Sequence, residues 1–160
     1  LGGFGLVANG CIPKPTFWSF VFFKNLKRGE GECVFKNDNA VIMKMKDGSF
    51  RGVLWNDTRK RAGKDMTAKV SLETIPGEYC ILTKRVDEDT CNPLKLWHDL
   101  GEPANLTEEQ TLLLRSAAQP FVRSLHRKTG SSCEPFGSSL ISFGIADKSA
   151  TWTVLFGTFR

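Results

Sequence analysis

Short alternating segments separated by turn residues fill the chain after Gly31 and constrain its fold most strongly. Asp47-Gly48 stands between two largely apolar runs, Val41–Lys46 and Phe50–Trp55, in the pattern of a tight β-hairpin. The pattern predicts a mainly β chain with antiparallel pairing. The expected strands are Cys33–Lys36, Ala40–Lys46, Phe50–Asn56, Lys69–Thr74, Glu78–Val86, Ser139–Ala146 and Ala150–Phe159.

Residues 1–30 follow a different pattern. Leu1–Ala8 predicts a short glycine-rich strand and Asn9-Gly10 a turn, while apolar residues recur at helical spacing from Thr16 to Lys27, before Gly29. This helix requires a large neighbour, either the β-structure that follows or a body outside this chain. Its apolar residues are Phe17, Trp18, Phe20, Val21, Phe22, Phe23 and Leu26.

Two further segments favour helix. Asn92–Gly101 predicts a short helical or irregular segment. Thr107 with Gln110 three residues later resembles a capping box, so we expect a second helix through Ala117 that ends before Pro120.

Composition bounds the kind of protein. The chain has 160 residues, a formal charge of +5 and 24% charged residues, which fits one globular domain but not a complete barrel enzyme of about 250 residues. The longest apolar run, Phe17 to Phe23, is far short of the roughly 20 residues that cross a bilayer, so no membrane span is expected. The chain begins at Leu1 without a signal peptide. We therefore expect that the true start has been removed or that this is one piece of a longer polypeptide.

The compartment of a soluble chain like this, cytoplasmic or secreted, stays open. The sequons at Asn56 and Asn105 are compatible with secretion but do not decide it. The cysteines show no zinc-knuckle spacing, and we expect buried free thiols, although Cys80 and Cys91 could close a hairpin in an oxidising compartment. The five cysteines are Cys11, Cys33, Cys80, Cys91 and Cys133.

Few residues suggest a cofactor, metal or nucleic-acid site. His98 and His126 stand alone, the first expected to pack beside Trp97 and the second on a basic surface strand. Gly2-Gly3-Phe4-Gly5 completes neither a dinucleotide fingerprint nor a Walker motif, so no cofactor is predicted. The basic run Arg59–Lys64 has no interleaved aromatic residues, which favours a solvated loop over a nucleic-acid site.

Sugar hydrolysis would require two carboxylates that flank a glycosidic bond, one with a raised pKa. None of the candidates has the apolar neighbours in sequence that raise a pKa, so the residues alone predict no catalytic pair. The candidates are Glu30, Glu32, Asp38, Asp47, Asp57, Asp87, Glu88 and Asp89.

Two groups of motifs resemble a known family. Gly2-Gly3-Phe4-Gly5-Leu6, Ile12-Pro13-Lys14-Pro15 and the aromatic helix are similar to the last strand, loop and helix of the catalytic barrel in glycoside hydrolase family 39, which holds β-xylosidases and α-L-iduronidases. Val53-Leu54-Trp55-Asn56, Trp97 before Gly101-Glu102-Pro103, and the Leu106–Pro120 helix resemble the β-sandwich after that barrel in bacterial xylosidases. The resemblance covers residues 1 to about 120.

The resemblance implies a domain division and a missing active centre. Residues 1–30 would be the last unit of a (β/α)8 barrel, and residues 31–160 an antiparallel β-sandwich with short helices. The family's acid/base and nucleophile glutamates lie near the ends of the fourth and seventh barrel strands, so both would lie upstream of Leu1. No catalytic residue is then expected in this chain, which alone would be inactive.

The resemblance also implies partners. They are the catalytic barrel, as another chain or a preceding segment, and a xylosidic or related oligosaccharide; a homo-oligomer stays possible. Phe4 would stand near the active-site end of the barrel as a candidate substrate-binding residue, with a plain core role as the alternative. No nucleic-acid or membrane partner is expected.

A second hypothesis is a non-catalytic carbohydrate-binding or interaction module. Trp55, Trp97 or Trp152 would then be exposed sugar platforms. The competing role for each is core packing, because tryptophan buries a large apolar surface.

Overall fold

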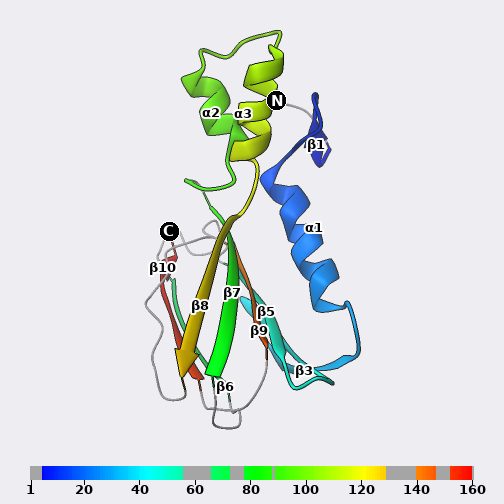
Figure 1. Cartoon of the computed structure of the whole chain (residues 1–160), viewed down its shortest axis with the longest axis vertical. Coiled ribbons are helices and arrows are strands. Elements are labelled where there is room, and N and C mark those ends of the chain that lie inside the picture. The colour runs from blue at the N-terminus through cyan, green and yellow to red at the C-terminus, as the bar shows by residue number, and fades with distance from the viewer. Residues whose placement is uncertain are drawn as a thin grey trace.

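Strands make up most of the regular structure in the computed structural model, which describes residues 5–55, 66–72, 78–87, 89–128, 140–146 and 152–159 (Figure 1). The helices are α1 (Pro15–Leu26), α2 (Pro93–Asp99) and α3 (Glu108–Ala117). The strands are β1 (Val7–Ala8), β2 (Ile12–Pro13), β3 (Gly31–Lys36), β4 (Ala40–Met45), β5 (Phe50–Trp55), β6 (Met66–Leu72), β7 (Glu78–Val86), β8 (Phe121–Lys128), β9 (Leu140–Ala146) and β10 (Trp152–Phe159). The fold is mixed, with antiparallel sheets and a few helices, which confirms the antiparallel pairing and the short helices that the sequence predicts.

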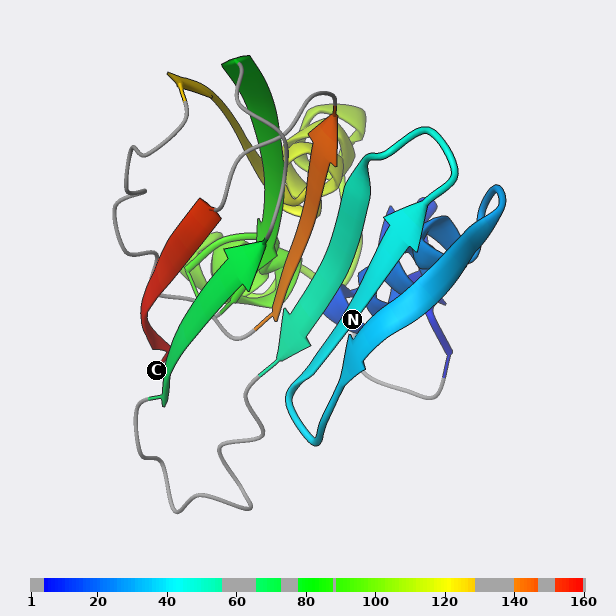
Figure 2. The ribbon, with the colours of Figure 1, turned by 90° about the horizontal axis from the view of Figure 1, so that it is seen from below.

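The described strands form one large and two small sheets. The large sheet has six strands in the order β3-β4-β5-β9-β7-β8, and every pairing in it is antiparallel. The pairs β10-β6 and β1-β2 are also antiparallel. Figures 1 and 2 show β6 and β10 together on the side of the large sheet away from α1.

The last two expected strands exist but belong to different sheets. β9 lies between β5 and β7, whereas β10 pairs with β6 through Trp152 opposite Leu72. Alternation of apolar residues predicts a strand but carries no information on its partner. The sequence predicted a strand at His126 without bounds, and His126 lies on β8.

The β4-β5 hairpin confirms the Asp47-Gly48 prediction. Lys44 lies opposite Phe50, the amide of Met45 donates to the carbonyl of Ser49 at 2.8 Å, and Gly48 has a φ of +82°. That left-handed conformation favours glycine because it has no Cβ. The Asp47 carboxylate accepts from the Ser49 amide at 2.9 Å and closes the turn.

The predicted helix ends are confirmed within one residue at most places. α1 begins at Pro15, whose fixed φ suits the first helical position. Both bonds of the capping box at α3 are present: Gln110 N donates to Thr107 Oγ1 at 3.1 Å, and Thr107 N donates to Gln110 Oε1 at 3.0 Å. The Asn92 side chain caps α2 by accepting from Lys95 N at 3.2 Å.

The core of the described part contains a cluster that joins α1 to the large sheet. One stripe of α1, Trp18, Phe22 and Leu26, repeats every four residues and faces this cluster, as helical geometry requires. Arg51 of β5 also donates to the carbonyl of Asn25 at 3.1 Å and to that of Arg28, so it caps the end of α1. The buried members are Phe22, Leu26, Val53, Val86 and Cys91.

A second cluster joins the β1-β2 pair to α2 and α3. Ile12, Leu114 and Ala118 are fully buried in it. Arg115 Nε donates to the carbonyl of Gly10 at 2.6 Å, which fixes the β1-β2 turn on α3. Residues 5–26 therefore pack against both the sheet and the helices.

The carbonyl of Ala118 connects the two clusters. It accepts hydrogen bonds from Trp18 Nε1 at 2.7 Å and from the Cys91 thiol at 3.1 Å. Three segments far apart in the sequence, α1, the loop before α2 and the end of α3, meet at this oxygen.

Two expectations from the sequence are incomplete or wrong. The strand expected over Leu1–Ala8 is described only from Gly5, and its end, Val7–Ala8, pairs antiparallel with Ile12–Pro13. The thiols are not uniformly buried: Cys91 is buried, Cys80 half-buried, and Cys11 and Cys33 exposed.

The alternative pairing of Cys80 with Cys91 is also absent. Cys80 lies within β7 opposite His126 and Ala146, whereas Cys91 lies beyond the end of that strand; both are free. Cys133 lies outside the described residues.

None of the helices in the described part of the chain combines the length and apolar character of a membrane crossing.

Trp18→Phe should lower the free energy of unfolding by about 2 kcal/mol, because it removes a long-range hydrogen bond and leaves space in a packed cluster. The matched control is Trp97→Phe, whose Nε1 donates only to the nearby Pro103 carbonyl at 3.2 Å. Urea unfolding followed by circular dichroism should show the larger loss for Trp18→Phe. Equal losses would contradict the role given to the Ala118 carbonyl.

Candidate functional site

The predicted substrate-binding residue, Phe4, lies outside the described residues. The first described residue is Gly5, which is exposed and has a φ of +122°. The next two residues, Leu6 and Val7, are also exposed. The role of Phe4 stays a prediction.

Three of the candidate carboxylates, Glu30, Asp87 and Asp89, are paired with cations. Glu30 forms an ion pair with Lys46, the Asp87 carboxylate lies 3.0 Å from Arg85 Nε, and the Asp89 carboxylate lies 2.9 Å from Lys95 Nζ. Asp57 and Glu88 lie outside the described residues.

The pKa values of two carboxylates, Asp47 and Asp89, are lowered, which disfavours either as a general acid. Hydrogen bonds from Ser49 hold the pKa of Asp47 below its usual value, and the hydrogen bond and charge of Lys95 lower the pKa of Asp89. A general acid in glycoside hydrolysis requires a raised pKa so that it carries a proton near neutral pH. Asp47 and Asp89 are therefore charged surface groups rather than catalytic acids.

His98 lies beside Trp97, as the sequence predicts, and His126 is on a strand. The His98 ring lies 5.1 Å from the Trp97 ring, and its Nδ1 lies 2.7 Å from Glu102 Oε1 on the surface. His126 is on β8, and its side chain lies outside what the structure describes. Within the described ranges, no group of three or more His, Cys, Asp and Glu side chains could hold a metal ion.

Two of the three candidate sugar-platform tryptophans pack into the clusters. Trp55 lies against Phe23 with ring centroids 5.7 Å apart, and Trp97 packs beside the Ile12 cluster. This packing favours the core role for both. Trp152 is placed on β10 without a described side chain.

Two of the remaining candidate features lie outside the described residues. The basic run Arg59–Lys64 and the sequon at Asn56 are both there, whereas Asn105 is exposed in the loop before α3.

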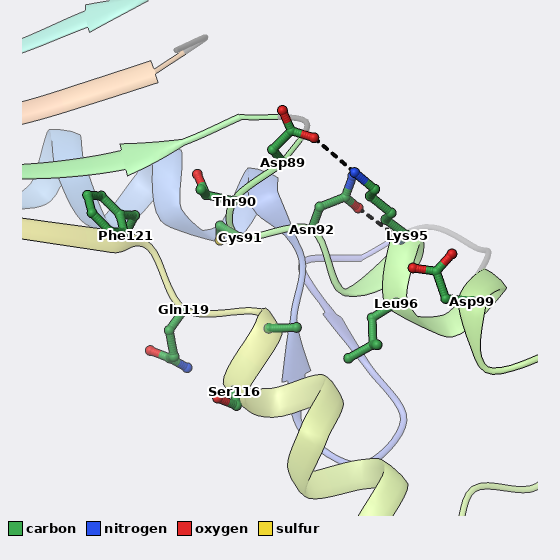
Figure 3. A pocket seen from close by; sticks show the side chains of 11 residues that line it. Asp89, Thr90, Cys91, Asn92, Lys95, Leu96, Asp99, Ser116, Gln119 and Phe121 are labelled. Carbon is green, nitrogen blue, oxygen red and sulfur yellow. Dashed lines mark hydrogen bonds and ion pairs between the residues drawn. The ribbon is translucent and has the colours of Figure 1, made fainter. Parts of the chain in front are cut away.

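A pocket of about 360 Å³ lies between the β7-α2 loop, α2 and the end of α3 (Figure 3). Phe121, at the start of β8, forms one wall, and the rest combines polar side chains with the apolar Leu96 and Ala117. Sequence reasoning missed it, because its lining comes from segments that only the tertiary structure brings together. The polar lining residues include Asp89, Thr90, Asn92, Lys95, Asp99, Ser116 and Gln119.

A second hollow, of about 550 Å³, follows the outer face of α1. It is lined by Phe20 and Phe23 with Ser19, Lys24 and Lys27, and the two phenylalanines are 65% and 40% exposed. The sequence predicted more apolar surface on this helix than residues 1–30 could cover, and part of that surface is exposed on this face.

Comparison with known proteins identifies the class. The family model for glycosyl hydrolases family 39 matches residues 1–132. The chain is 36% identical over 130 residues to a beta-xylosidase of Geobacillus stearothermophilus, covering 79% of this chain and 25% of the relative. It is 29% identical over 122 residues to a beta-xylosidase of Caldicellulosiruptor saccharolyticus, covering 74% and 25%.

Solved structures share the fold. A GH39 enzyme from Xanthomonas axonopodis pv. citri aligns with a TM-score of 0.67 and 18% identity, over 91% of this chain and 32% of that one. A monomeric beta-xylosidase from Caulobacter crescentus CB15 aligns with a TM-score of 0.66 and 20% identity, over 91% and 33%.

The chain belongs to glycosyl hydrolases family 39. It spans about a quarter of the length of the curated relatives that it matches. The family resemblance drawn from the sequence motifs is confirmed.

Cys91 should resist alkylation in the folded protein. Burial, with a smaller contribution from the charge of Asp87, raises the pKa of its thiol to about 12, so the reactive thiolate is scarce at pH 8. Iodoacetamide followed by peptide mass spectrometry should label the exposed Cys11 and Cys33 first, and Cys91 only after unfolding. Labelling of Cys91 as fast as Cys33 in the native protein would contradict this.

Proposed function

We propose that this chain is the C-terminal part of a retaining family 39 glycoside hydrolase that acts on β-xylosides. The acid/base and nucleophile glutamates would come from a catalytic barrel upstream of Leu1 or on another chain. The observation that carries the proposal is the 36% identity with a beta-xylosidase over 130 residues, which are only 25% of that relative. Three quarters of such an enzyme would then lie outside the matched segment.

The proposed division places the end of the barrel in residues 1–30 and an accessory β-sandwich in residues 31–160. The six-stranded sheet and the β6-β10 pair would be the two layers of the sandwich. The β1-β2 turn would follow the last barrel strand, at the end of a barrel where active sites lie. Phe4 would stand just before this turn.

The two faces of α1 support a barrel as the neighbour. The stripe of Phe22 and Leu26 is buried against the large sheet, whereas Phe20 and Phe23 on another face stay exposed. A helix with two apolar faces is typical of an element packed between two bodies. The barrel would cover the second face.

The physical role of this part is then to support the active centre. A retaining mechanism requires two carboxyl groups about 5 Å apart. Small shifts between them slow the reaction strongly. Helix α1, fixed by the Trp18 bond and by the Arg51 cap, would hold the last barrel strand in place.

The isolated chain should not hydrolyse aryl β-xylosides, because the proposed acid/base and nucleophile glutamates lie outside it. A polypeptide that joins a family 39 barrel to this chain should hydrolyse them. Release of the aryl group, measured by absorbance, distinguishes the two proteins. Turnover by the purified 160-residue chain would overturn the proposal.

Phe20→Ser with Phe23→Ser should weaken the contact with the barrel. The isolated double variant should self-associate less than the unchanged chain, since it removes exposed apolar surface. The joined protein with the same changes should lose thermal stability and xyloside turnover. Leu112→Ser, an exposed leucine on α3, is the control and should leave both unchanged in the joined protein. Unchanged stability and turnover in the joined double variant would contradict a barrel on this face.

A further inference from the structure

We infer that the pocket between the β7-α2 loop, α2 and the end of α3 binds a neutral, linear oligosaccharide, with Phe121 as its aromatic platform. The choice of a xylo-oligosaccharide as the ligand rests on the proposed function. The aromatic ring, polar groups, charge and shape of the pocket support sugar binding independently of that function.

Phe121 is exposed and held in place. The residue is 47% exposed, and the Arg85 guanidinium carbon lies over one face of its ring, 5.0 Å from the centroid. Arg85 is in turn paired with Asp87, whose carboxylate accepts from the Thr90 amide at 2.6 Å and from the Thr90 hydroxyl at 2.8 Å. This chain of contacts limits the motion of the ring. An accessible aromatic face that is already ordered offers a surface for the C–H face of a pyranose ring at low entropic cost.

The polar lining suits hydroxyl groups, which both donate and accept hydrogen bonds. Asp89 and Lys95 bond to each other at 2.9 Å, yet a carboxylate has further acceptor sites and an ammonium further donors. Gln119, another lining residue, donates from Nε2 to the Arg115 carbonyl at 3.3 Å, and its amide oxygen is a further acceptor. Among the described residues, Asp99 has no ion-pair partner.

The charge of the lining selects against anions. Two acidic residues, Asp89 and Asp99, outnumber the single basic lining residue Lys95, although the whole chain carries +5. A phosphate-bearing ligand or an acidic peptide would meet repulsion from the two carboxylates. A neutral polyhydroxylated ligand would not.

The shape favours a chain of sugar rings. Figure 3 shows Phe121 and Gln119 at one end of the lining and Lys95 and Asp99 at the other, with Thr90, Cys91 and Asn92 between them. A volume of about 360 Å³ falls in the range of small-molecule pockets. Leu96 and Ala117 add apolar surface that suits the C–H groups of a sugar.

The pocket shares no lining residue with the hollow of Phe20 and Phe23 on α1. In Figure 1, α2 and β8 lie on the side away from α1. A barrel on the outer face of α1 would therefore leave the pocket open.

Surface plasmon resonance tests the inference. The 160-residue chain is immobilised, which prevents self-association, and xylotriose is passed over it. We expect saturable binding that falls at least about tenfold in Phe121→Ala and several-fold in Asp99→Ala. Phe121→Tyr keeps the ring and should bind as the unchanged chain does. Phe20→Ala, which alters an exposed phenylalanine outside the pocket, should also have no effect. Near-ultraviolet circular dichroism checks that each variant is folded.

Absence of saturable xylotriose binding, or binding that Phe121→Ala leaves unchanged, would overturn the inference. The failure of this site is distinguishable from that of the proposed function. Xyloside turnover by the joined protein without sugar binding in this pocket overturns only the pocket, whereas sugar binding without turnover by the joined protein overturns only the proposed function.

Discussion

The carbonyl oxygen of Ala118 is the point on which the arrangement of the described elements depends. Ala118 is the C-cap residue of α3, and its carbonyl accepts hydrogen bonds from Trp18 of α1 and from the Cys91 thiol. The oxygen therefore joins three segments that the sequence separates by up to 100 residues. A buried carbonyl without partners is costly, so these donors favour one arrangement over its alternatives. Two apolar clusters, one around Phe22 and one around Ile12, lie on either side of this oxygen, which connects them.

Local features of this fold could be predicted because local physics determines them. The β4-β5 hairpin follows from a turn that needs a positive φ at Gly48, and the start of α3 from a capping box whose two bonds involve Thr107 and Gln110 alone. Strand order could not be predicted, since β9 enters between β5 and β7 through pairings distant in sequence. The Phe121 pocket escaped prediction for the same reason, and the exposure of Cys11 shows that a typical preference for burial does not decide a single residue.

The surplus of aromatic residues on α1 connects sequence, fold and function. Its buried stripe explains how residues 5–26 attach to the large sheet, and its exposed Phe20 and Phe23 explain why a neighbour is required. The proposed function gives that neighbour a chemical identity, a barrel that would carry the catalytic glutamates. The chain would then contribute support for the active centre and a sugar-binding pocket on another side, rather than the bond-breaking groups.

The mass and sequence of the native polypeptide that contains this segment test the central claim most directly. Purification from the source organism, followed by intact mass measurement and peptide sequencing, would identify what precedes or accompanies Leu1. The account predicts a protein or complex of about 500 residues, since 130 matched residues are 25% of a relative, with two glutamates at the ends of barrel strands. A native 160-residue protein with no barrel-bearing partner would contradict it.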